Sequence, residues 1–470
     1  MCNKYIVLLS SIITFASCQT NPSSQLDTAF AEAEKVVESI VIPQFCNDTL
    51  NIVAFGAKTT SSALDNQRAI QAAIDSACNI NGACVVIPSG EWLTAPIVMK
   101  SGVNLIVSKD ATLKFSTDHK DYLPAVKTRW EGLDCYNLTP LIYADSVKNI
   151  AITGEGTIDG QGSNETWWYM KGLAKFGWND GMISQLQGGR DSLLAYDKRQ
   201  VDIKDRIMDI KDGLRPQLIN ICNSKNVLIE GVTLKNSPFW VIHPLLVTNL
   251  TVRGVKIESH GPNSDGCDPE SCSNVLIDNC FFDTGDDCIA IKSGRNYDGR
   301  RWNTPSQNII VRNCHMKNGH GGVVVGSEIS GGFSNLWVEN CIMDSPELER
   351  VVRIKTSNCR GGVIENIFVR NVEVGQCQEA ILKINLNYEP NEPCIREFPP
   401  VVQNVNLENI SSKKSEYGVR IIGLDESPEN VKDVFINNCR FNGVEKGNSV
   451  TNSTNVKAVD LYINNQLAEL

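Results

Sequence analysis

The chain has 470 residues, of which 42% are hydrophobic and 21% are charged, so a large packed core is expected and extensive disorder is excluded. Lys and Arg number 44 against 54 Asp and Glu, which gives a formal net charge of −10 with no basic stretch. This balance excludes a typical nucleic-acid-binding protein, and we expect no such partner. It does not exclude an anionic ligand, because a few local cations can reverse the field inside one cleft.

Residues 1–17 have the pattern of an export signal. A charged start is followed by a short apolar run from Tyr5 to Ala16, which is too short to span a bilayer, and then by Cys18. The pattern is typical of a bacterial lipoprotein, whose lipidated first residue would be Cys18; an ordinary secretory signal is the alternative. We therefore expect an exported protein, periplasmic or anchored at the outer membrane of a bacterium, with residues 18–48 as a tether or extension.

The next predicted element is a helix over residues 64–77, with Asp65 as its N-cap. Its apolar residues share one face: Ala69, Ile70, Ala73, Ile74 and Ala77. Because a solenoid needs its open end covered, we interpret this helix as an N-terminal cap.

An internal repeat predicts the architecture. Weak copies of an alternating apolar and polar pattern occur at 103–115 and 149–162, and strong copies begin at Asn226. Eight strong copies start at residues 226, 249, 274, 308, 335, 366, 404 and 433. Strands that recur once per unit without helices between them indicate a right-handed parallel β-helix, and leucine-rich repeats lack support. We expect an all-β protein with a single such domain over residues 49–470.

The repeat lapses between residues 162 and 216, which we interpret as an excursion over one face of the solenoid. Trp167, Trp168 and Trp178 lie in this segment, where they either stack on a ligand or anchor the segment in the core.

Several of the 17 cysteines occupy one position of the repeat, in DNC, RNC, ENC and NNC. These are Cys280, Cys314, Cys341 and Cys439. Such residues are expected to be buried free thiols. The better disulfide candidates are Cys78 with Cys84 and Cys267 with Cys272. The sequence contains no CxxC pair, so we do not expect a structural zinc site.

Titratable side chains recur at comparable positions in four consecutive strong repeats. They are Asp265, then Asp286 with Asp287, then His320, then Arg353 with Lys355. In a parallel solenoid, equal position means one face, with neighbouring coils about 5 Å apart. Three carboxylates, a histidine and two cations are therefore expected to share one patch.

Glycosidic bond hydrolysis needs such a set, because one carboxylic acid protonates the leaving oxygen while a carboxylate activates water. The two cations would bind a carboxylate on the sugar, which indicates an acidic polysaccharide. Each residue also has a simpler explanation as a turn residue or an outward strand position. Calcium binding by the aspartates is a further alternative, but the repeated pattern that it needs is missing.

Four short segments of the chain resemble the signature motifs of the polygalacturonases, glycoside hydrolase family 28, in the family's order. They are Asn263-Ser264-Asp265, Gly285-Asp286-Asp287, Gly319-His320-Gly321 and Arg353-Ile354-Lys355. The resemblance extends from about Phe55 to Lys355 and more weakly to about residue 440, with RWEG at 129 and GSEISGG at 326 as further matches. One departure is Ser264, where the family usually has Thr.

The resemblance implies an inverting hydrolase of α-1,4-linked galacturonic acid in pectin, without a cofactor or a metal. Asp286 would be the general acid, Asp265 and Asp287 would hold and activate the water, and His320 would tune the ionisation of the acid. The substrate-binding residues would be Asn263, Arg353, Lys355 and Tyr388.

Within the family, the sequence is most similar to bacterial exo-acting members. Residues 162–216 would close one end of the cleft, which would enforce attack from a chain end. Alternatives are a hydrolase of rhamnogalacturonan or another decorated pectin, a calcium-dependent pectate lyase, and a non-catalytic glycan-binding solenoid. We expect a monomer acting on polysaccharide or oligogalacturonides.

Overall fold

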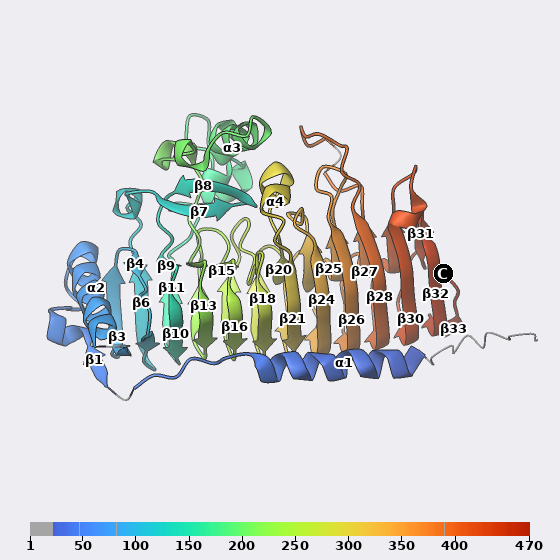
Figure 1. Ribbon diagram of the computed structural model, residues 1–470, viewed down its shortest axis with the longest axis horizontal. Coiled ribbons are helices and arrows are strands. Elements are labelled where there is room, and N and C mark those ends of the chain that lie inside the picture. Colours follow the sequence, from blue (N-terminus) through green and yellow to red (C-terminus); the bar gives the residue numbers. More distant parts are fainter. Residues whose placement is uncertain (1–21, 47, 81, 390) are drawn as a thin grey trace, which may run out of the picture.

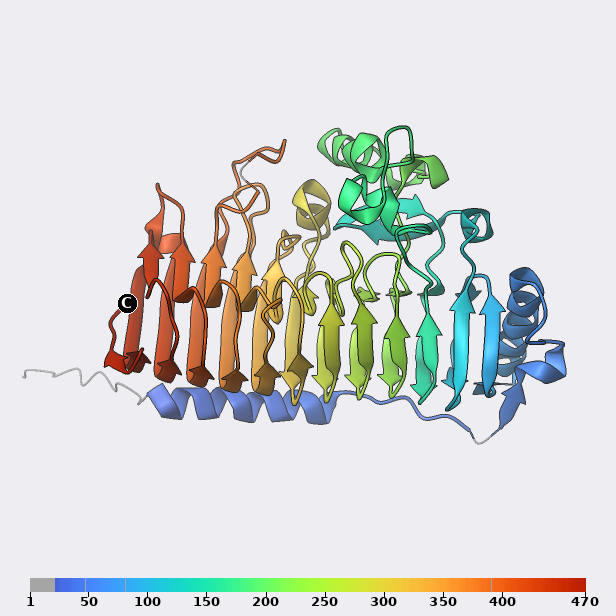
Figure 2. The ribbon, with the colours of Figure 1, turned by 180° about the vertical axis from the view of Figure 1, so that it is seen from behind.

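The computed structural model describes residues 22–46, 48–80, 82–389 and 391–470. The predicted signal at residues 1–17 and Cys18 lie outside these residues. Successive coils of the chain stack their strands into a right-handed parallel β-helix (Figures 1 and 2). The all-β solenoid expected from the repeat is therefore confirmed.

Three sheets build the coils, and their strands pair in parallel except for the last two strands of the largest sheet, which are antiparallel. The four-stranded sheet contains β4 (Ile97–Val98), β9 (Ile142–Asp145), β12 (Ile219–Cys222) and β15 (Ile242–Leu245). The six-stranded sheet contains β20 (Ile289–Ile291), β23 (Val323–Gly326), β25 (Arg350–Lys355), β27 (Ala380–Asn385), β29 (Tyr417–Ile422) and β31 (Ser449–Thr451). The 21-stranded sheet contains β1 (Thr49–Asn51), β2 (Ala83–Ile87), β3 (Gly90–Thr94), β5 (Val103–Val107), β6 (Ala111–Phe115), β10 (Lys148–Gly154), β11 (Thr157–Asp159), β13 (Lys225–Glu230), β14 (Thr233–Lys235), β16 (Thr248–Arg253), β17 (Lys256–Ser259), β18 (Ser273–Asp278), β19 (Phe281–Thr284), β21 (Ser306–Arg312), β22 (His315–Met316), β24 (Phe333–Met343), β26 (Val363–Val374), β28 (Val401–Ser412), β30 (Val431–Phe441), β32 (Thr454–Ile463) and β33 (Gln466–Leu467).

The asparagines that start the repeats hold the coils in register. Each adopts a positive φ, which Asn tolerates better than most residues, and so turns the chain at the same place in every coil. Their side chains form a ladder in which Asn249 Nδ2 donates to Asn226 Oδ1 at 2.9 Å and Asn335 Nδ2 to Asn308 Oδ1 at 2.9 Å. The residue after each asparagine points into a core of stacked Val, Leu and Ile side chains.

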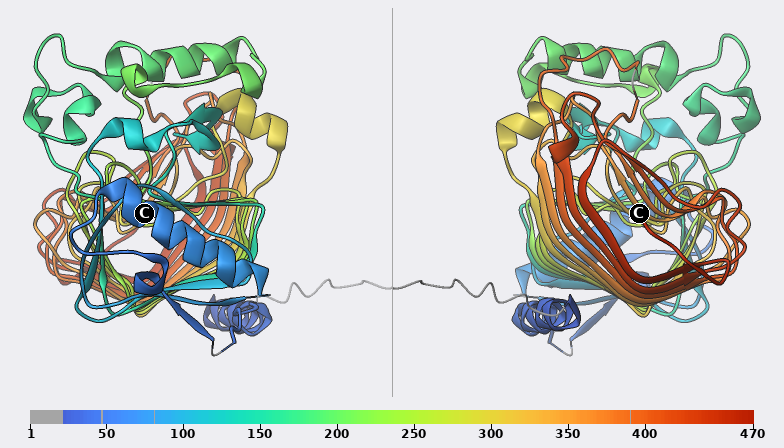
Figure 3. Two further views of the ribbon diagram at one scale, coloured as in Figure 1. Left: turned by 90° about the vertical axis from the view of Figure 1, so that its left-hand side faces the viewer. Right: turned by 90° about the vertical axis from the view of Figure 1, so that its right-hand side faces the viewer.

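The predicted capping helix is α2 (Ala63–Asn79), which lies across the N-terminal end of the solenoid (Figure 3). All five predicted apolar residues of its inner face are buried. The predicted N-cap was wrong. Ser62 is the N-cap, because its side chain accepts the backbone N–H of Asp65, and Asp65 lies in the first turn.

Residues 18–48, expected as a tether, include an unpredicted helix, α1 (Pro22–Ser39), that runs along the outside of the long strands (Figure 1). Its apolar face covers a stripe of side chains on β18, β21, β24 and β26. The buried cluster comprises Leu26, Phe30, Ala33 and Ile40 with Leu276, Ile310, Trp337 and Phe368. No helix in the part of the chain that the structure describes combines the length and apolar character needed to cross a membrane.

Above the strands, the antiparallel hairpin of β7 (Val126–Trp130) and β8 (Leu133–Asn137) carries the expected excursion (Figures 1 and 2). The excursion contains α3 (Gly189–Lys198) and several short 3₁₀ helices, and it packs near α4 (Asn296–Trp302). One buried ion pair lies within the hairpin, where Arg129 Nε is 2.9 Å from Asp134 Oδ1. A second, between Arg206 and Asp298, joins the excursion to α4.

Trp167 anchors the excursion and does not face a ligand, because it is fully buried and packs edge-on against Tyr122. Trp168 likewise donates from Nε1 to the carbonyl of Ser237 at 3.0 Å. Of the two explanations offered for these tryptophans, anchoring in the core is the one that holds for Trp167 and Trp168.

The four repeat cysteines are buried free thiols, as expected. Both proposed disulfide pairs were wrong, because Cys78, Cys84, Cys267 and Cys272 are also free. The disulfide joins Cys359 to Cys394, whose Cα atoms lie 5.7 Å apart. The segment after β27 folds back to bring these two residues together, which their separation of 35 residues does not reveal.

Candidate active site

A cleft of about 380 Å³ opens on the outer face of the solenoid, beside the six-stranded sheet. Seven of the eight predicted site residues line it: Asn263, Asp265, Asp286, His320, Arg353, Lys355 and Tyr388. The eighth, Asp287, is fully buried beneath the cleft, within 2.7 Å of the Lys355 ammonium.

Stacking of the coils brings the charged residues together. Cys267, Ile289 and Val323 are bridged in register on three successive coils. Asp265 lies two residues before Cys267 and Asp287 two residues before Ile289, so these two aspartates occupy equivalent places on adjacent coils. Asp286 lies three residues before Ile289 and His320 three residues before Val323, so they too occupy equivalent places. His320 therefore lies directly beside Asp286, with Nδ1 3.0 Å from Oδ1.

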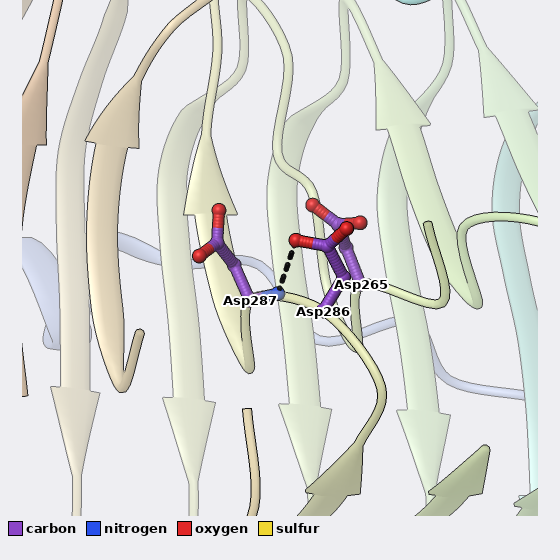
Figure 4. A group of neighbouring side chains, drawn as sticks. All are labelled: Asp265, Asp286 and Asp287. Atoms are coloured by element: carbon purple, nitrogen blue, oxygen red, sulfur yellow. Dashed lines mark hydrogen bonds between the residues drawn. The ribbon is translucent and has the colours of Figure 1, made fainter. Parts of the chain in front are cut away.

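The three aspartates form one compact group. Each offers a carboxylate oxygen, and these oxygens lie within 4.8 Å of one another. Figure 4 shows Asp265 and Asp286 side by side, with the backbone N–H of Asp287 donating to Asp286 Oδ1 at 3.0 Å. Carboxylates gathered this closely can share one small group, such as a water molecule.

The surroundings push the pKa values of two of these carboxyl groups apart. Burial raises the pKa of Asp286, but the charge of His320 and its hydrogen bond outweigh burial and hold this pKa well below its usual range. Burial raises the pKa of Asp265 well above its usual range, and the charges of Asp268 and Asp286 raise it further. These opposite shifts favour the ionised form of Asp286 and the protonated form of Asp265.

His320 carries the second proton of the group. The charge of Asp286 is the main cause that raises the pKa of His320 to about 9, together with their hydrogen bond. Its Nε2 also lies 3.8 Å from a carboxylate oxygen of Glu349. At neutral pH the pair of His320 and Asp286 therefore holds one transferable proton.

Two cations and an aromatic ring form the side of the cleft over β25. Arg353 Nη1 lies 3.6 Å from Asp287 Oδ1, and Lys355 Nζ lies 2.7 Å from Asp287 Oδ2. The ring centroid of Tyr388 lies 5.5 Å from both the Arg353 guanidinium carbon and Lys355 Nζ. Two cations share one carboxylate here, which leaves positive charge for an anionic ligand.

The sequence predicted that residues 162–216 would close one end of the cleft, but it assigned no role to the individual residues of this segment that line the cleft. Lys171, from the excursion, donates from Nζ to Asn263 Oδ1 at 2.8 Å. Arg190, also from the excursion, lies 2.9 Å from Glu131 Oε2, which in turn lies 3.3 Å from Arg295 Nη1. Only the RWEG and GSEISGG segments, which hold Glu131 and Glu328, gave a signal in the sequence.

A buried lysine next to the aspartates was also missed. Lys292 Nζ lies 3.2 Å from Glu328 Oε2 and 3.8 Å from carboxylate oxygens of both Asp265 and Asp268. Burial alone would lower the pKa of Lys292, but these carboxylates raise it well above its usual value. Lys292 is therefore a fixed positive charge beneath Asp265.

Comparisons with known proteins agree with this geometry. Residues 203–459 match the model of glycosyl hydrolases family 28. The chain is similar to the crystal structure of a hyperthermoactive exopolygalacturonase from Thermotoga maritima, with 37% identity, 94% of this chain and 98% of that chain covered, and a TM-score of 0.89.

Two curated relatives show the same similarity over most of the chain. An exo-poly-alpha-D-galacturonosidase of Dickeya chrysanthemi is 28% identical over 84% of this chain and 67% of its own. An endo-polygalacturonase of Pectobacterium carotovorum subsp. carotovorum is 29% identical over 78% of this chain and 80% of its own. With the family model matching more than half of its residues and the carboxylate group assembled in the cleft, this chain belongs to glycosyl hydrolases family 28.

Proposed function

We propose that the protein hydrolyses α-1,4-galacturonosidic bonds of pectin, releasing sugars from a chain end with inversion. The observation that carries this proposal is the joint placement of three aspartates and the Arg353 and Lys355 pair in one cleft. Carboxylic acids supply the proton and the activated water, and the paired cations match a galacturonate carboxylate. The names of the similar proteins, which include both exo- and endo-acting polygalacturonases, support the substrate class.

In the proposed mechanism Asp286 delivers a proton to the glycosidic oxygen, and His320 supplies that proton through the 3.0 Å contact. Asp265 and Asp287 hold the attacking water. Arg353 and Lys355 orient the sugar through its carboxylate, with the Tyr388 ring packed against both cations.

The directions of these pKa shifts favour a second assignment of roles. The raised pKa of Asp265 favours its protonated form and the lowered pKa of Asp286 its ionised form, so Asp265 would be the acid and Asp286 the base. We prefer Asp286 as the acid, because its partner His320 carries a proton in direct contact, while Asp265 lies beside the fixed charge of Lys292, which favours its ionised form.

Leaving-group chemistry distinguishes the two assignments. If Asp286 is the acid, Asp286→Asn should lose about 10²–10⁴ in kcat on oligogalacturonides but little on a galacturonide with an activated phenol as leaving group, which departs without protonation. Asp265→Asn should lose rate on both substrates and recover with added azide. The reverse pattern would transfer the acid role to Asp265.

We infer the exo mode from the closed end of the cleft. Two residues of the excursion, Lys171 and Arg190, line the cleft. Arg190 pairs with Glu131, and Glu131 pairs with Arg295. Arg295 also pairs with Glu392 at 3.0 Å, so a continuous series of ion pairs borders this end of the cleft. A wall of these residues would accommodate a chain end and block a passing chain, which supports the exo mode.

The test is the product profile from unesterified polygalacturonate with a chelator present, followed by chain length over time. We expect early mono- or digalacturonate alone. A ladder of intermediate oligomers would overturn the exo mode, and activity that requires calcium would indicate a lyase. Products only from rhamnogalacturonan would overturn the proposed substrate.

The role of the wall is tested with the variant Arg190→Gln, which should release longer products as well. The matched control is Arg199→Gln, because Arg199 is an exposed arginine at the end of α3.

A further inference from the structure

A row of cations continues from the cleft along the six-stranded sheet. Arg353 on β25 is in register with Lys383 on β27, which is in register with Arg420 on β29. Residues in register on parallel strands point to the same side of the sheet and repeat about every 4.8 Å. Because Arg353 lines the cleft, Lys383 and Arg420 extend the same face toward the C-terminal coils.

One carboxylate positions most of these cations. Glu379 accepts hydrogen bonds from Lys383 and from Arg350, and from Arg420 Nη1 at 2.7 Å. Arg350 also lines the cleft, so the group is continuous with the catalytic site. Glu379 therefore fixes the geometry of the row.

The row has more positive than negative charge. Its five cations are Arg350, Arg353, Lys355, Lys383 and Arg420, and the carboxylates paired with them are Asp287, Glu349 and Glu379. An excess of two positive charges is thus concentrated on one face of a chain whose net charge is −10. Ion pairing within the protein does not account for this excess, and an anionic ligand would.

The position of the row relative to the closed end gives it a direction. The wall formed by the excursion lies on the side of Asn263 and Lys171, whereas the row begins at Arg353 and runs the other way. A chain whose end is held at the wall and that follows this face of the sheet would leave the cleft over β27 and β29. Each coil of the solenoid would then meet about one further sugar and its carboxylate.

We propose that Lys383 and Arg420 form an anion-binding track for the carboxylates of galacturonate units beyond the scissile bond. The track rests on the proposed function and deepens it, because it makes the enzyme selective for long, unesterified chains over short fragments. Methyl esterification removes the charge that the track recognises. Loss of the track would leave the residues that break the glycosidic bond in place.

The test compares chain lengths in the double variant Lys383→Gln/Arg420→Gln. We expect KM for polygalacturonate to rise about 5- to 30-fold, because one largely buried cation, Lys383, and one partly exposed cation, Arg420, are lost. The kcat/KM for digalacturonate should change less than about 2-fold. The matched control is Lys432→Gln/Arg440→Gln, which removes the same charge from β30, outside the cleft and the row. This control variant should leave KM for polygalacturonate and kcat/KM for digalacturonate unchanged.

Direct binding separates the track from the reaction. In an Asp286→Asn background, calorimetry should show affinity rising with oligogalacturonate length, and the double variant should abolish that rise. Arg420→Gln alone, whose side chain is 31% exposed, gives a variant that is not expected to disturb folding and should show a smaller loss in the same direction.

Two outcomes would overturn the track. Equal losses on digalacturonate and polymer would show that the row only supports Arg353, and no loss on either substrate would leave it without a role. Failure of the unaltered protein to hydrolyse any galacturonide would refute the proposed function, and in that case retained, length-dependent binding would still support the track.

Discussion

Replacing His320 with Gln removes a cation that directly contacts Asp286. The imidazole Nδ1 lies 3.0 Å from Asp286 Oδ1, and the charge of that carboxylate is the main cause that raises the pKa of His320 to about 9. Gln keeps a hydrogen-bond donor of similar size but carries no charge. The substitution therefore tests the charge and not the space that the side chain fills.

The magnitude follows from the pKa of His320. A rise from 6.5 to about 9 corresponds to roughly 3.4 kcal/mol at about 1.36 kcal/mol per pKa unit. The side chain is 47% exposed, so solvent screens the interaction and we expect about 1–2 kcal/mol. Because the pKa is higher in the folded state, this stabilisation is complete below pH 6.5 and is lost as the pH rises through about 9.

Two measurements check this expectation. Denaturant unfolding should show His320→Gln to be less stable by about 1–2 kcal/mol near pH 6, with the difference vanishing above about pH 9. The alkaline limb of the profile of kcat/KM against pH should also move to lower pH in the variant, because Asp286 must then hold the donated proton alone.

The matched control is His260→Gln, since His260 Nε2 lies 3.1 Å from an oxygen of Asp283 outside the cleft. This variant should leave the alkaline limb of activity in place. A stability difference between His320→Gln and the unaltered protein that is constant from about pH 5 to pH 10 would refute the reasoning. So would an alkaline limb at the same pH in both proteins.

Three further predictions concern binding and stability. Lys355→Ala should raise KM for galacturonides by about 10-fold or more, because the cation facing the sugar carboxylate is lost; steady-state kinetics measure this, and an unchanged KM would contradict it. Cys394→Ser opens the link to Cys359 and should cost up to about 4 kcal/mol in the free energy of unfolding, as chemical denaturation would show. Phe30→Ala should cost about 2 kcal/mol and expose α1 to limited proteolysis without changing kcat, because α1 packs away from the cleft; a fall in kcat would contradict this.

The repeat made the solenoid and most of the candidate site predictable. Alternating residues specify strands, and an asparagine, or an aspartate at residue 433, starts each strong repeat and specifies where the coil turns, so the register follows from the sequence. Once the register is known, Asp265, Asp286 and His320 must lie on neighbouring coils of one face. Local patterns repeated many times therefore determined both the fold and its charged face.

Other features depended on segments that have no repeat. The helix α1 has an apolar face, but its partners, such as Trp337, lie some 300 residues further along the chain. The disulfide between Cys359 and Cys394 likewise depends on how one loop folds back. Neither partner choice is encoded in a local pattern.

The wall of the cleft likewise combines a segment that the sequence predicted with contacts that it did not predict. The sequence predicted an excursion after Gly162, but not that it would place Lys171 beside Asn263 or Arg190 beside Glu131. These contacts join the excursion to the β7–β8 hairpin and to the loop of Asn263 through long side chains and buried charges. Their pairing is decided only when the whole chain has folded. The sequence by itself determined the coils and the acids that they carry, and the tertiary structure decided which charges enclose them.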